Sequence, residues 1–249
     1  SRKTLAFWAS IVLPVIICGL VAFGFYNSAD KIVKFNYTPE VYWFQFLRPT
    51  ISIMGTLILP FYIIFMAFSV NNLEHKNDTW KTLFAQPLNK LSIYSAKYFY
   101  GLVLIFICLF LFFLLSWLAG LGLSVLDSRF GFNKVSPVQF LSSIYFRTFL
   151  SALGIFSIQF ILSLVWGDFL KPMGIGFVLT IAGMITTMVG WKHAWLIPYG
   201  SPIGATQLGG KNPFKEPLEI MTDGIWVSIA FAAVLYVAGY YILSKRNIK

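Results

Sequence analysis

The residues that most often perform chemistry in proteins are few in this chain. Its two histidines, His75 and His193, lie far apart, and neither has a cysteine or carboxylate at a helical metal-ligand spacing. Glu74 is adjacent to His75, but neighbouring residues on a helix point about 100° apart and are poorly placed to share a metal ion. The sequence therefore predicts no metal site and no catalytic residue.

The sequence also lacks a phosphate-binding loop for nucleotides. Such a loop reads G-x-x-x-x-G-K-[ST], because glycine amides surround the phosphates and the hydroxyl group holds magnesium. The nearest run, residues 205–212, reads ATQLGGKN and lacks both the first glycine and the final hydroxyl. No cofactor is expected in this chain, so energy for any work must come from another protein.

One stretch, residues 71–91, combines charged residues with a set of apolar side chains. If Asp78 caps a short helix that ends at Pro87, then Trp80, Leu83 and Phe84 share one face at positions i, i+3 and i+4. An aromatic and aliphatic face flanked by charge suits a groove on a cytoplasmic protein. The alternative is an interfacial helix whose apolar face lies among lipid head groups.

The composition is typical of a membrane protein. Of the 249 residues, 58% are hydrophobic and only 11% are charged, whereas about a quarter are charged in a soluble domain. In a soluble protein the net charge of +10 would suggest nucleic acid. Here the basic residues are scattered between apolar runs, which indicates contact with membrane lipids and no nucleic-acid partner. Cys18 and Cys108 lie inside apolar runs and are expected to be buried small hydrophobic residues.

Six apolar runs are long enough to cross a bilayer, so we expect one all-α transmembrane domain over residues 1–249. The predicted spans are residues 5–26, 50–70, 98–123, 144–166, 173–190 and 224–243. Pro49 precedes the second span, where a proline suits a helix start. Arg147 lies near one end of its span and Lys97 just outside the third, so both are expected to reach the interface and to form no ion relay.

Six spans place both termini on one side of the membrane. The basic residues divide almost evenly between the two sides, but the segments on the side of the termini are shorter. Their higher basic density, with Lys245 and Arg246 after the last span, favours cytoplasmic termini.

The three segments on the opposite side differ in character. Residues 27–48 are aromatic and predict a short interfacial helix or cap. In residues 125–143, Pro137 predicts the start of a helix that lies on the membrane. The third segment, residues 191–223, is either a re-entrant hairpin or an ordered loop in the aromatic belt.

Glycines recur every seven residues in the fifth span, at Gly176, Gly183 and Gly190. This spacing places them near one helix face, where small residues let another backbone approach closely. The expected use is a packing seam, within the bundle or across a dimer. The alternative is chance recurrence in a glycine-rich membrane helix.

The order of residues in the 71–91 stretch resembles that of a known family, the permease subunits of type-2 ABC exporters. The nearest group contains the lantibiotic-immunity and bacitracin-resistance permeases. The residues that carry the resemblance lie between the second and third spans, and the six-span plan extends it over the whole chain. They are Glu74, Thr79, Trp80, Lys81, Leu83, Pro87 and Lys97.

The resemblance implies that this stretch is a coupling helix, with Phe84 beside the residues just given. Such a helix docks on a cytoplasmic ABC ATPase subunit, present in two copies, which would hold the ATP and magnesium. It also implies a second permease subunit, identical or related, in a bacterial cytoplasmic membrane. The complex would move an amphiphilic or hydrophobic substrate outward, such as a peptide antibiotic, a lipid or a drug.

The sequence departs from the family at two places. Almost nothing precedes residue 5, where members have an amphipathic elbow helix, and Asp78 replaces a glycine found in many members. Two other functions stay open. One is a membrane-embedded enzyme or assembly scaffold, for which only residues 191–223 offer room. The other is an ion-coupled carrier, which is disfavoured because no acidic residue lies within a span core.

Overall fold

The computed structural model describes residues 5–76, 89–207, 214 and 216–245, and the side chains of residues 72–76 are not described. Helices account for 86% of these residues and no strand occurs among them, which confirms the predicted all-α fold class. Six of the described helical stretches are long and apolar enough to cross a membrane. The six predicted spans therefore correspond to six helical stretches.

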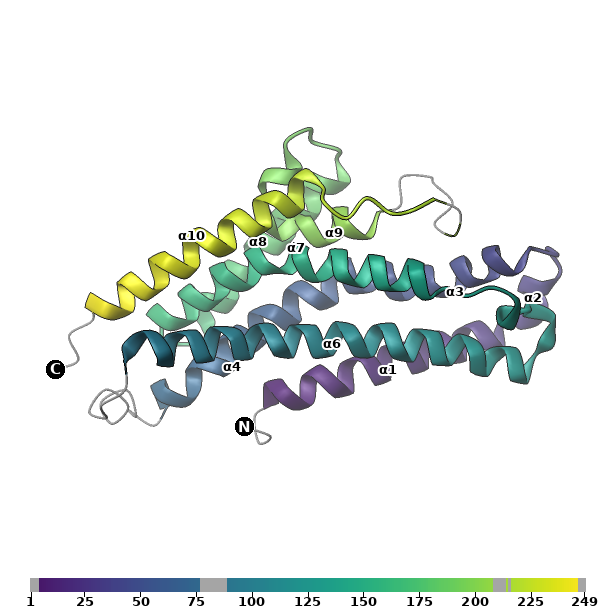
Figure 1. The fold of residues 1–249 in the computed structure, drawn as a ribbon, viewed down its shortest axis with the longest axis horizontal. Coiled ribbons are helices and arrows are strands. Elements are labelled where there is room, and N and C mark those ends of the chain that lie inside the picture. Colours follow the sequence, from purple (N-terminus) through teal and green to yellow (C-terminus); the bar gives the residue numbers. More distant parts are fainter. Residues whose placement is uncertain (1–4, 77–88, 208–213, 215, 246–249) are drawn as a thin grey trace.

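The long helices run back and forth along one axis (Figure 1). The first described residue of α1 and the last of α10 lie toward the same end of the bundle, where α4 also ends and α6 begins. The principal helices are α1 (Leu5–Asn27), α3 (Pro39–Ile53), α4 (Leu59–Lys76), α6 (Lys90–Leu126), α7 (Val138–Val165), α8 (Leu170–Met188) and α10 (Asp223–Lys245). The short elements are α2 (Ala29–Val33), η1 (Met54–Ile58), η2 (Ser128–Phe130), η3 (Phe132–Lys134), η4 (Ala194–Leu196), η5 (Pro198–Gly200) and α9 (Ser201–Thr206).

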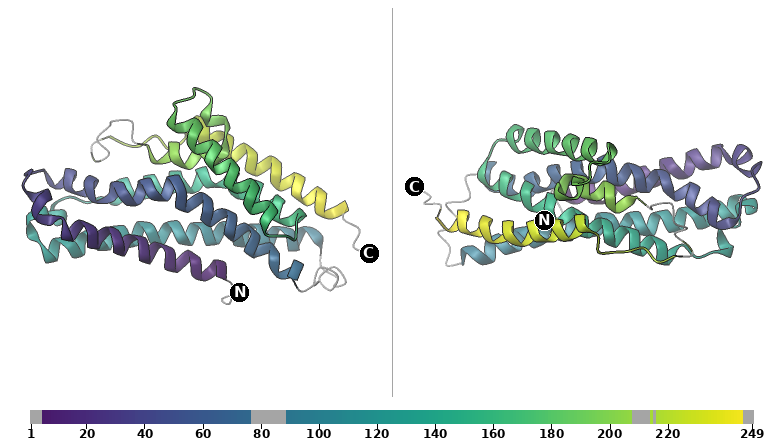
Figure 2. Two further views of the ribbon diagram at one scale, coloured as in Figure 1. Left: turned by 180° about the vertical axis from the view of Figure 1, so that it is seen from behind. Right: turned by 90° about the horizontal axis from the view of Figure 1, so that it is seen from above.

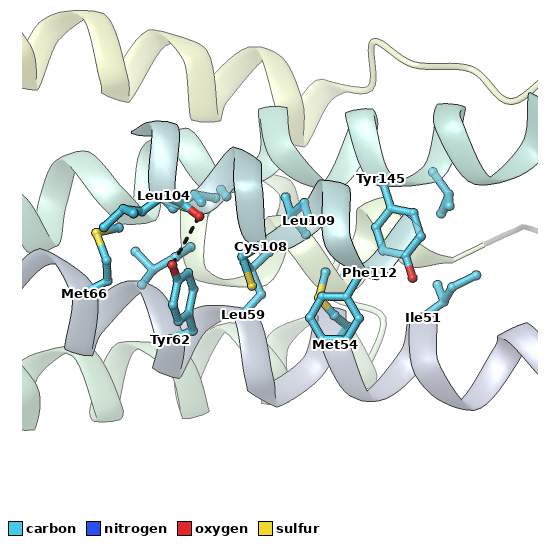
Figure 3. Packing of buried hydrophobic residues seen from close by; sticks show 14 of the residues in the cluster. Ile51, Met54, Leu59, Tyr62, Met66, Leu104, Cys108, Leu109, Phe112 and Tyr145 are labelled. Carbon is cyan, nitrogen blue, oxygen red and sulfur yellow. Dashed lines mark hydrogen bonds between the residues drawn. The ribbon is translucent and has the colours of Figure 1, made fainter. Parts of the chain in front are cut away.

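Helices α4, α6 and α7 form the centre of the bundle. Helix α1 packs on α6 at one side, and α10 packs on α7 at the other, as both views in Figure 2 illustrate. Where α3 and α4 face α6, the core contains Met54, Leu59, Leu109 and Phe112 (Figure 3). Tyr62 donates a hydrogen bond to the carbonyl oxygen of Leu104 at 3.2 Å, so this buried hydroxyl group has a partner.

The helix boundaries differ from the predicted short interfacial helix or cap over residues 27–48, followed by a span from residue 50. Pro39 occupies the first turn of α3, a position that needs no amide donor. The helical path then continues through Pro49 and the π-helical turn η1 into α4. The buried aromatic side chains of Tyr42, Trp43 and Phe46 explain why α3 belongs to the bundle.

These side chains belong to a buried cluster at the end of the bundle away from the termini, which we call the aromatic end. It comprises Phe25, Tyr42, Trp43, Phe46, Phe130 and Phe132. The ring centroids of Trp43 and Phe132 are 4.6 Å apart, and the Trp43 indole donates to the carbonyl oxygen of Phe132 at 3.0 Å. The aromatic residues of the predicted interfacial segment therefore fill the core.

Two further boundaries differ from the predictions. A helix does begin after Pro137, as predicted, but α7 then runs unbroken to Val165, so it crosses the bundle and does not lie on the membrane as a separate element. Helix α6 begins at Lys90, which places Lys97 inside it and not outside the third span. Both helices extend beyond the predicted spans because buried apolar side chains continue past the ends of the most hydrophobic runs.

Candidate functional site

The predicted coupling residues fall on a part of the chain that the structure does not describe. Thr79, Trp80, Lys81, Leu83, Phe84 and Pro87 lie outside the described residues. Glu74 lies in the last described turns of α4, but its side chain is not described. What the structure does describe is how the two helices that flank this stretch are held.

The helix before the stretch is held by hydrogen bonds to α7. Asn71, which is fully buried, donates from Nδ2 to Ser163 Oγ at 2.8 Å and to the carbonyl oxygen of Phe160 at 3.3 Å. Ser163 in turn donates to the carbonyl oxygen of Ala67, at 3.0 Å. The end of α4 is thus joined to α7 by bonds in both directions.

The helix after the stretch is held by α7 and α10. The Asn89 side chain caps α6 by accepting from the amide of Leu91 at 2.9 Å. Tyr94 donates to the carbonyl oxygen of Tyr236 at 2.9 Å, and Tyr98 shares a 2.6 Å hydrogen bond with Ser157. A displacement at either flank of residues 77–88 would therefore act on α7, because both flanks are bonded to it.

A second candidate region is the hairpin formed by η4, η5 and α9, which packs among α7, α8 and α10. Most of its second half is buried, from Pro198 to Ile203. Tyr199, with 1% of its surface exposed, accepts a 2.6 Å hydrogen bond from Gln159 Nε2, which lies inside α7. Of the two predicted alternatives for residues 191–223, the folded-in hairpin therefore describes Pro198–Ile203 better than a surface loop does.

The three glycines of the predicted seam have different surroundings. A Cβ atom on Gly176 would collide with Gln159 and Ile64, and one on Gly183 would meet backbone atoms of Tyr199 and Gly200 at 2.5–2.6 Å. Gly190 follows α8 with a positive φ of 73°, and a Cβ atom there would meet nothing within 4 Å. The structure brings the first two glycines against partners within the bundle, whereas the third follows the end of the helix.

These contacts define what we call the polar seam, a group of buried side chains that form hydrogen bonds on α7 or between α7 and its neighbours. Its members are Asn71, Tyr98, Ser157, Gln159, Ser163 and Tyr199. Two acceptors in it, Asn71 Oδ1 and Gln159 Oε1, have no hydrogen-bond partner within the described part of the chain. Sequence reasoning missed this seam, although Asn71 and Gln159 are polar amides next to or inside apolar runs and could have been noted as such.

Arg147 was expected to extend to the membrane interface, but the structure shows that its side chain is buried within the bundle. Only 8% of its surface is exposed, and its Nη2 donates to the carbonyl oxygen of Gly204 at 3.1 Å. The reason is the hairpin, because α9 packs across α7 and covers the side chain. The residue is therefore a buried cation near the folded-in hairpin.

Among the described residues, no group of histidine, cysteine, aspartate and glutamate side chains is arranged to hold a metal ion. An apolar groove lies between α6 and α7, has a volume of about 160 Å³ and is lined mainly by phenylalanines. The geometry thus presents a helical membrane bundle with a buried polar seam and a folded-in hairpin.

Comparison with known proteins gives one match. The model of the ABC-2 family transporter protein matches residues 2–183, from the start of the chain into α8. No curated protein and no solved structure matches the chain. The match covers well over half of the 249 residues and agrees with the six apolar helices. The chain therefore belongs to the ABC-2 family of transporter proteins and is a membrane permease component of an ABC transporter.

Proposed function

We propose that the chain is the permease subunit of an ATP-driven exporter, powered by separate ATPase subunits that bind residues 71–91. Family membership supports the ABC transporter part of this proposal. The absence of a G-x-x-x-x-G-K-[ST] motif from the sequence supports an ATPase on another chain. Two ATPase copies, holding ATP and magnesium, would act on two permease subunits, identical or related.

The observation that carries this proposal is the hydrogen bonding at both flanks of the 71–91 stretch. Asn71 joins α4 to Ser163 of α7, and Tyr98 joins α6 to Ser157 of the same helix. An ATPase that binds the stretch differently in its two nucleotide states would bias the arrangement of α7 through these bonds. If α4 and α6 had no hydrogen bonds to α7, ATPase binding at the stretch would not shift α7 in this way.

The proposed orientation places both termini and residues 71–91 in the cytoplasm of a bacterium. The substrate is an amphiphilic or hydrophobic molecule that moves outward: a peptide antibiotic, a lipid or a drug. The large apolar surface of the bundle supports this class, since exposed side chains such as Phe106, Phe110 and Phe146 line or flank a groove that opens toward lipid.

Co-purification from the native host tests the proposal. The wild-type chain, solubilised in mild detergent, should bring down an ATP-hydrolysing subunit. Trp80→Ala and Leu83→Asp should each reduce the recovered ATPase, because they remove the apolar face expected to enter its groove. Both variants should insert into the membrane in normal amounts.

Trp226→Ala is the matched control, since Trp226 is 58% exposed, lies near the start of α10 and is not part of the 71–91 stretch. It should leave ATPase recovery unchanged. Normal recovery with both Trp80→Ala and Leu83→Asp would contradict docking at this stretch. If the wild-type chain recovers no ATPase, the enzyme or scaffold alternative takes its place.

A further inference from the structure

A polar cavity lies between the end of α8, the hairpin and the start of α10. Its volume is about 250 Å³, enough for a small polar group with its water molecules. The side chains that matter here are Arg147, Thr187, Ser201, Thr222 and Asp223, which all line it. This cavity lies where α10 begins, and α10 runs from there toward the end of the bundle at which α4 also ends (Figure 1).

Arg147 is the buried charge of this cavity. Its Nη2 bonds to Gly204, but Nε is buried and has no hydrogen-bond partner in the described residues. Glu219 acts on the guanidinium electrostatically, without a direct ion pair among the described residues. A buried cation that lacks a paired anion is costly, so an anionic group in this cavity would be stabilised strongly.

The other lining groups limit which atoms can donate hydrogen bonds to an anionic ligand. The hydroxyl groups of Ser201 and Thr187 already donate to the carbonyl oxygens of Gly224 and Gly183, so they offer lone pairs and not hydrogens. The first turn of α10, a 23-residue helix, borders the cavity and carries partial positive charge. The donors for an anion are therefore Arg147 and this helix start.

Acidic groups near the cavity limit the charge that it can accept. Asp223 is exposed at the cavity, and Glu219 is exposed nearby. Two carboxylates would repel a doubly charged inorganic phosphate more than a singly charged phosphodiester. Of the two kinds of phosphate group, the cavity therefore favours the one with a single negative charge.

The depth of the cavity matches that of lipid head groups. Trp195, which lines the cavity, is 40% exposed, and Trp226, near the start of α10, is 58% exposed. Tryptophan side chains concentrate at the membrane–water interface, where phosphodiester groups are also found.

We propose that this cavity binds the phosphate group of a phosphodiester lipid, with Arg147 as the principal donor. The planar guanidinium offers the N–H groups of its two Nη atoms to two phosphate oxygens, a geometry that lysine does not reproduce. The helix start of α10 contributes backbone amides. The site is independent of transport and of ATPase docking.

Thermal unfolding of the purified protein in an uncharged detergent tests the proposal. The probes are dioctanoyl phosphatidylglycerol, dioctanoylglycerol with the same acyl chains and no phosphate, and inorganic phosphate at matched ionic strength. The phospholipid should raise the unfolding temperature of the wild type in a saturable way, because it binds the folded state. Dioctanoylglycerol and inorganic phosphate should raise it much less.

Arg147→Gln should weaken phospholipid binding about tenfold or more, since charge-assisted hydrogen bonds are lost. Arg147→Lys should fall between this variant and the wild type. Arg48→Gln, which removes an exposed arginine on α3, is the matched control for net charge and should bind like the wild type.

Three results would overturn the proposal. One is equal stabilisation of the wild type by dioctanoylglycerol, and another is unchanged binding in Arg147→Gln. The third is equal stabilisation by inorganic phosphate, which would assign the cavity to the free ion and not to a lipid. If Arg147→Gln does not fold, the probe comparison on the wild type and the Arg147→Lys variant decides the matter.

Discussion

The aromatic end and the polar seam hold the same helices together by different means. At the aromatic end, Trp43, Phe46 and Phe132 are at most 2% exposed and the indole N–H has a partner. In the polar seam, single hydrogen bonds join the helices, and Asn71 and Gln159 each keep a buried acceptor with no partner in the described residues.

This difference in packing indicates which part of the bundle can rearrange with the smallest loss of free energy. Interdigitated aromatic rings resist displacement because a shift opens voids on one side and produces clashes on the other. A hydrogen bond between two helices in a membrane contributes only about 0.6 kcal/mol on average and can be exchanged for another. We infer that the aromatic end is the fixed part of the bundle and that the polar seam is the part that adjusts.

The largest effect is expected at the aromatic end. Trp43→Ala should lower the free energy of unfolding by about 3–5 kcal/mol, because it leaves a large cavity around Phe132 and Phe46. Denaturant titration in mixed micelles measures this cost. Trp8→Ala is the control, since Trp8 is 54% exposed and should be replaced at little cost. A small effect of Trp43→Ala would contradict the inference that the aromatic end is the fixed part of the bundle.

The next effect concerns the attachment of the hairpin to α8. Gly183→Val should lower the free energy of unfolding by about 1–3 kcal/mol, because its Cβ atom would collide with the backbone of Tyr199 and Gly200, which cannot rotate away. Gly174→Val in the same helix is the control, since nothing lies within 4 Å of a Cβ atom there. Equal unfolding temperatures for the two variants would show that the hairpin is not packed tightly on α8.

Within the polar seam the expected effect is smaller. Tyr199→Phe removes the 2.6 Å hydrogen bond from Gln159 and should cost about 1 kcal/mol. The control is Tyr26→Phe, which changes an exposed tyrosine on α1. The same denaturant titration applies. A cost as large as that of Trp43→Ala would contradict the view that the seam is the adjustable part.

The smallest effect lies just beyond the aromatic end. Arg129 pairs with Asp127 at 2.7 Å and with Asp30 at 2.9 Å, and its hydrogen bonds to Asp127 lower the pKa of that carboxyl group. Because the pKa is lower in the folded state, the stabilisation is present above the ordinary aspartate value of about 4 and is lost as the pH falls below it. The unfolding temperatures of wild type and Asp127→Asn should therefore converge on acidification.

A control separates this pair from other acidic groups. Arg129→Gln should return the pKa of Asp127 toward its ordinary value and remove most of the pH-dependent difference. The effect should be modest at every pH, since the Arg129 side chain is half exposed and screened by solvent. A difference between wild type and Asp127→Asn that persists at pH 2 would point to a cause other than this charge.

Much of the architecture could be predicted from the sequence, because the bilayer imposes local rules. A long apolar run must be helical to satisfy its backbone groups, so composition alone placed six spans and an all-α fold. The G-x-x-x-x-G-K-[ST] motif is likewise a local pattern that can be searched for directly. The 71–91 stretch was noticed for the same reason, as a polar interruption between apolar runs.

The tertiary structure alone decided what the polar and aromatic residues contact. Trp43 and Phe132 meet across 89 positions of sequence, and Arg147 meets Gly204 across 57. Neither pair follows from hydropathy, which gives the depth of a residue in the bilayer and not its neighbour. Arg147 was therefore expected at the interface by its position in the span, and it is buried because a later hairpin folds over it.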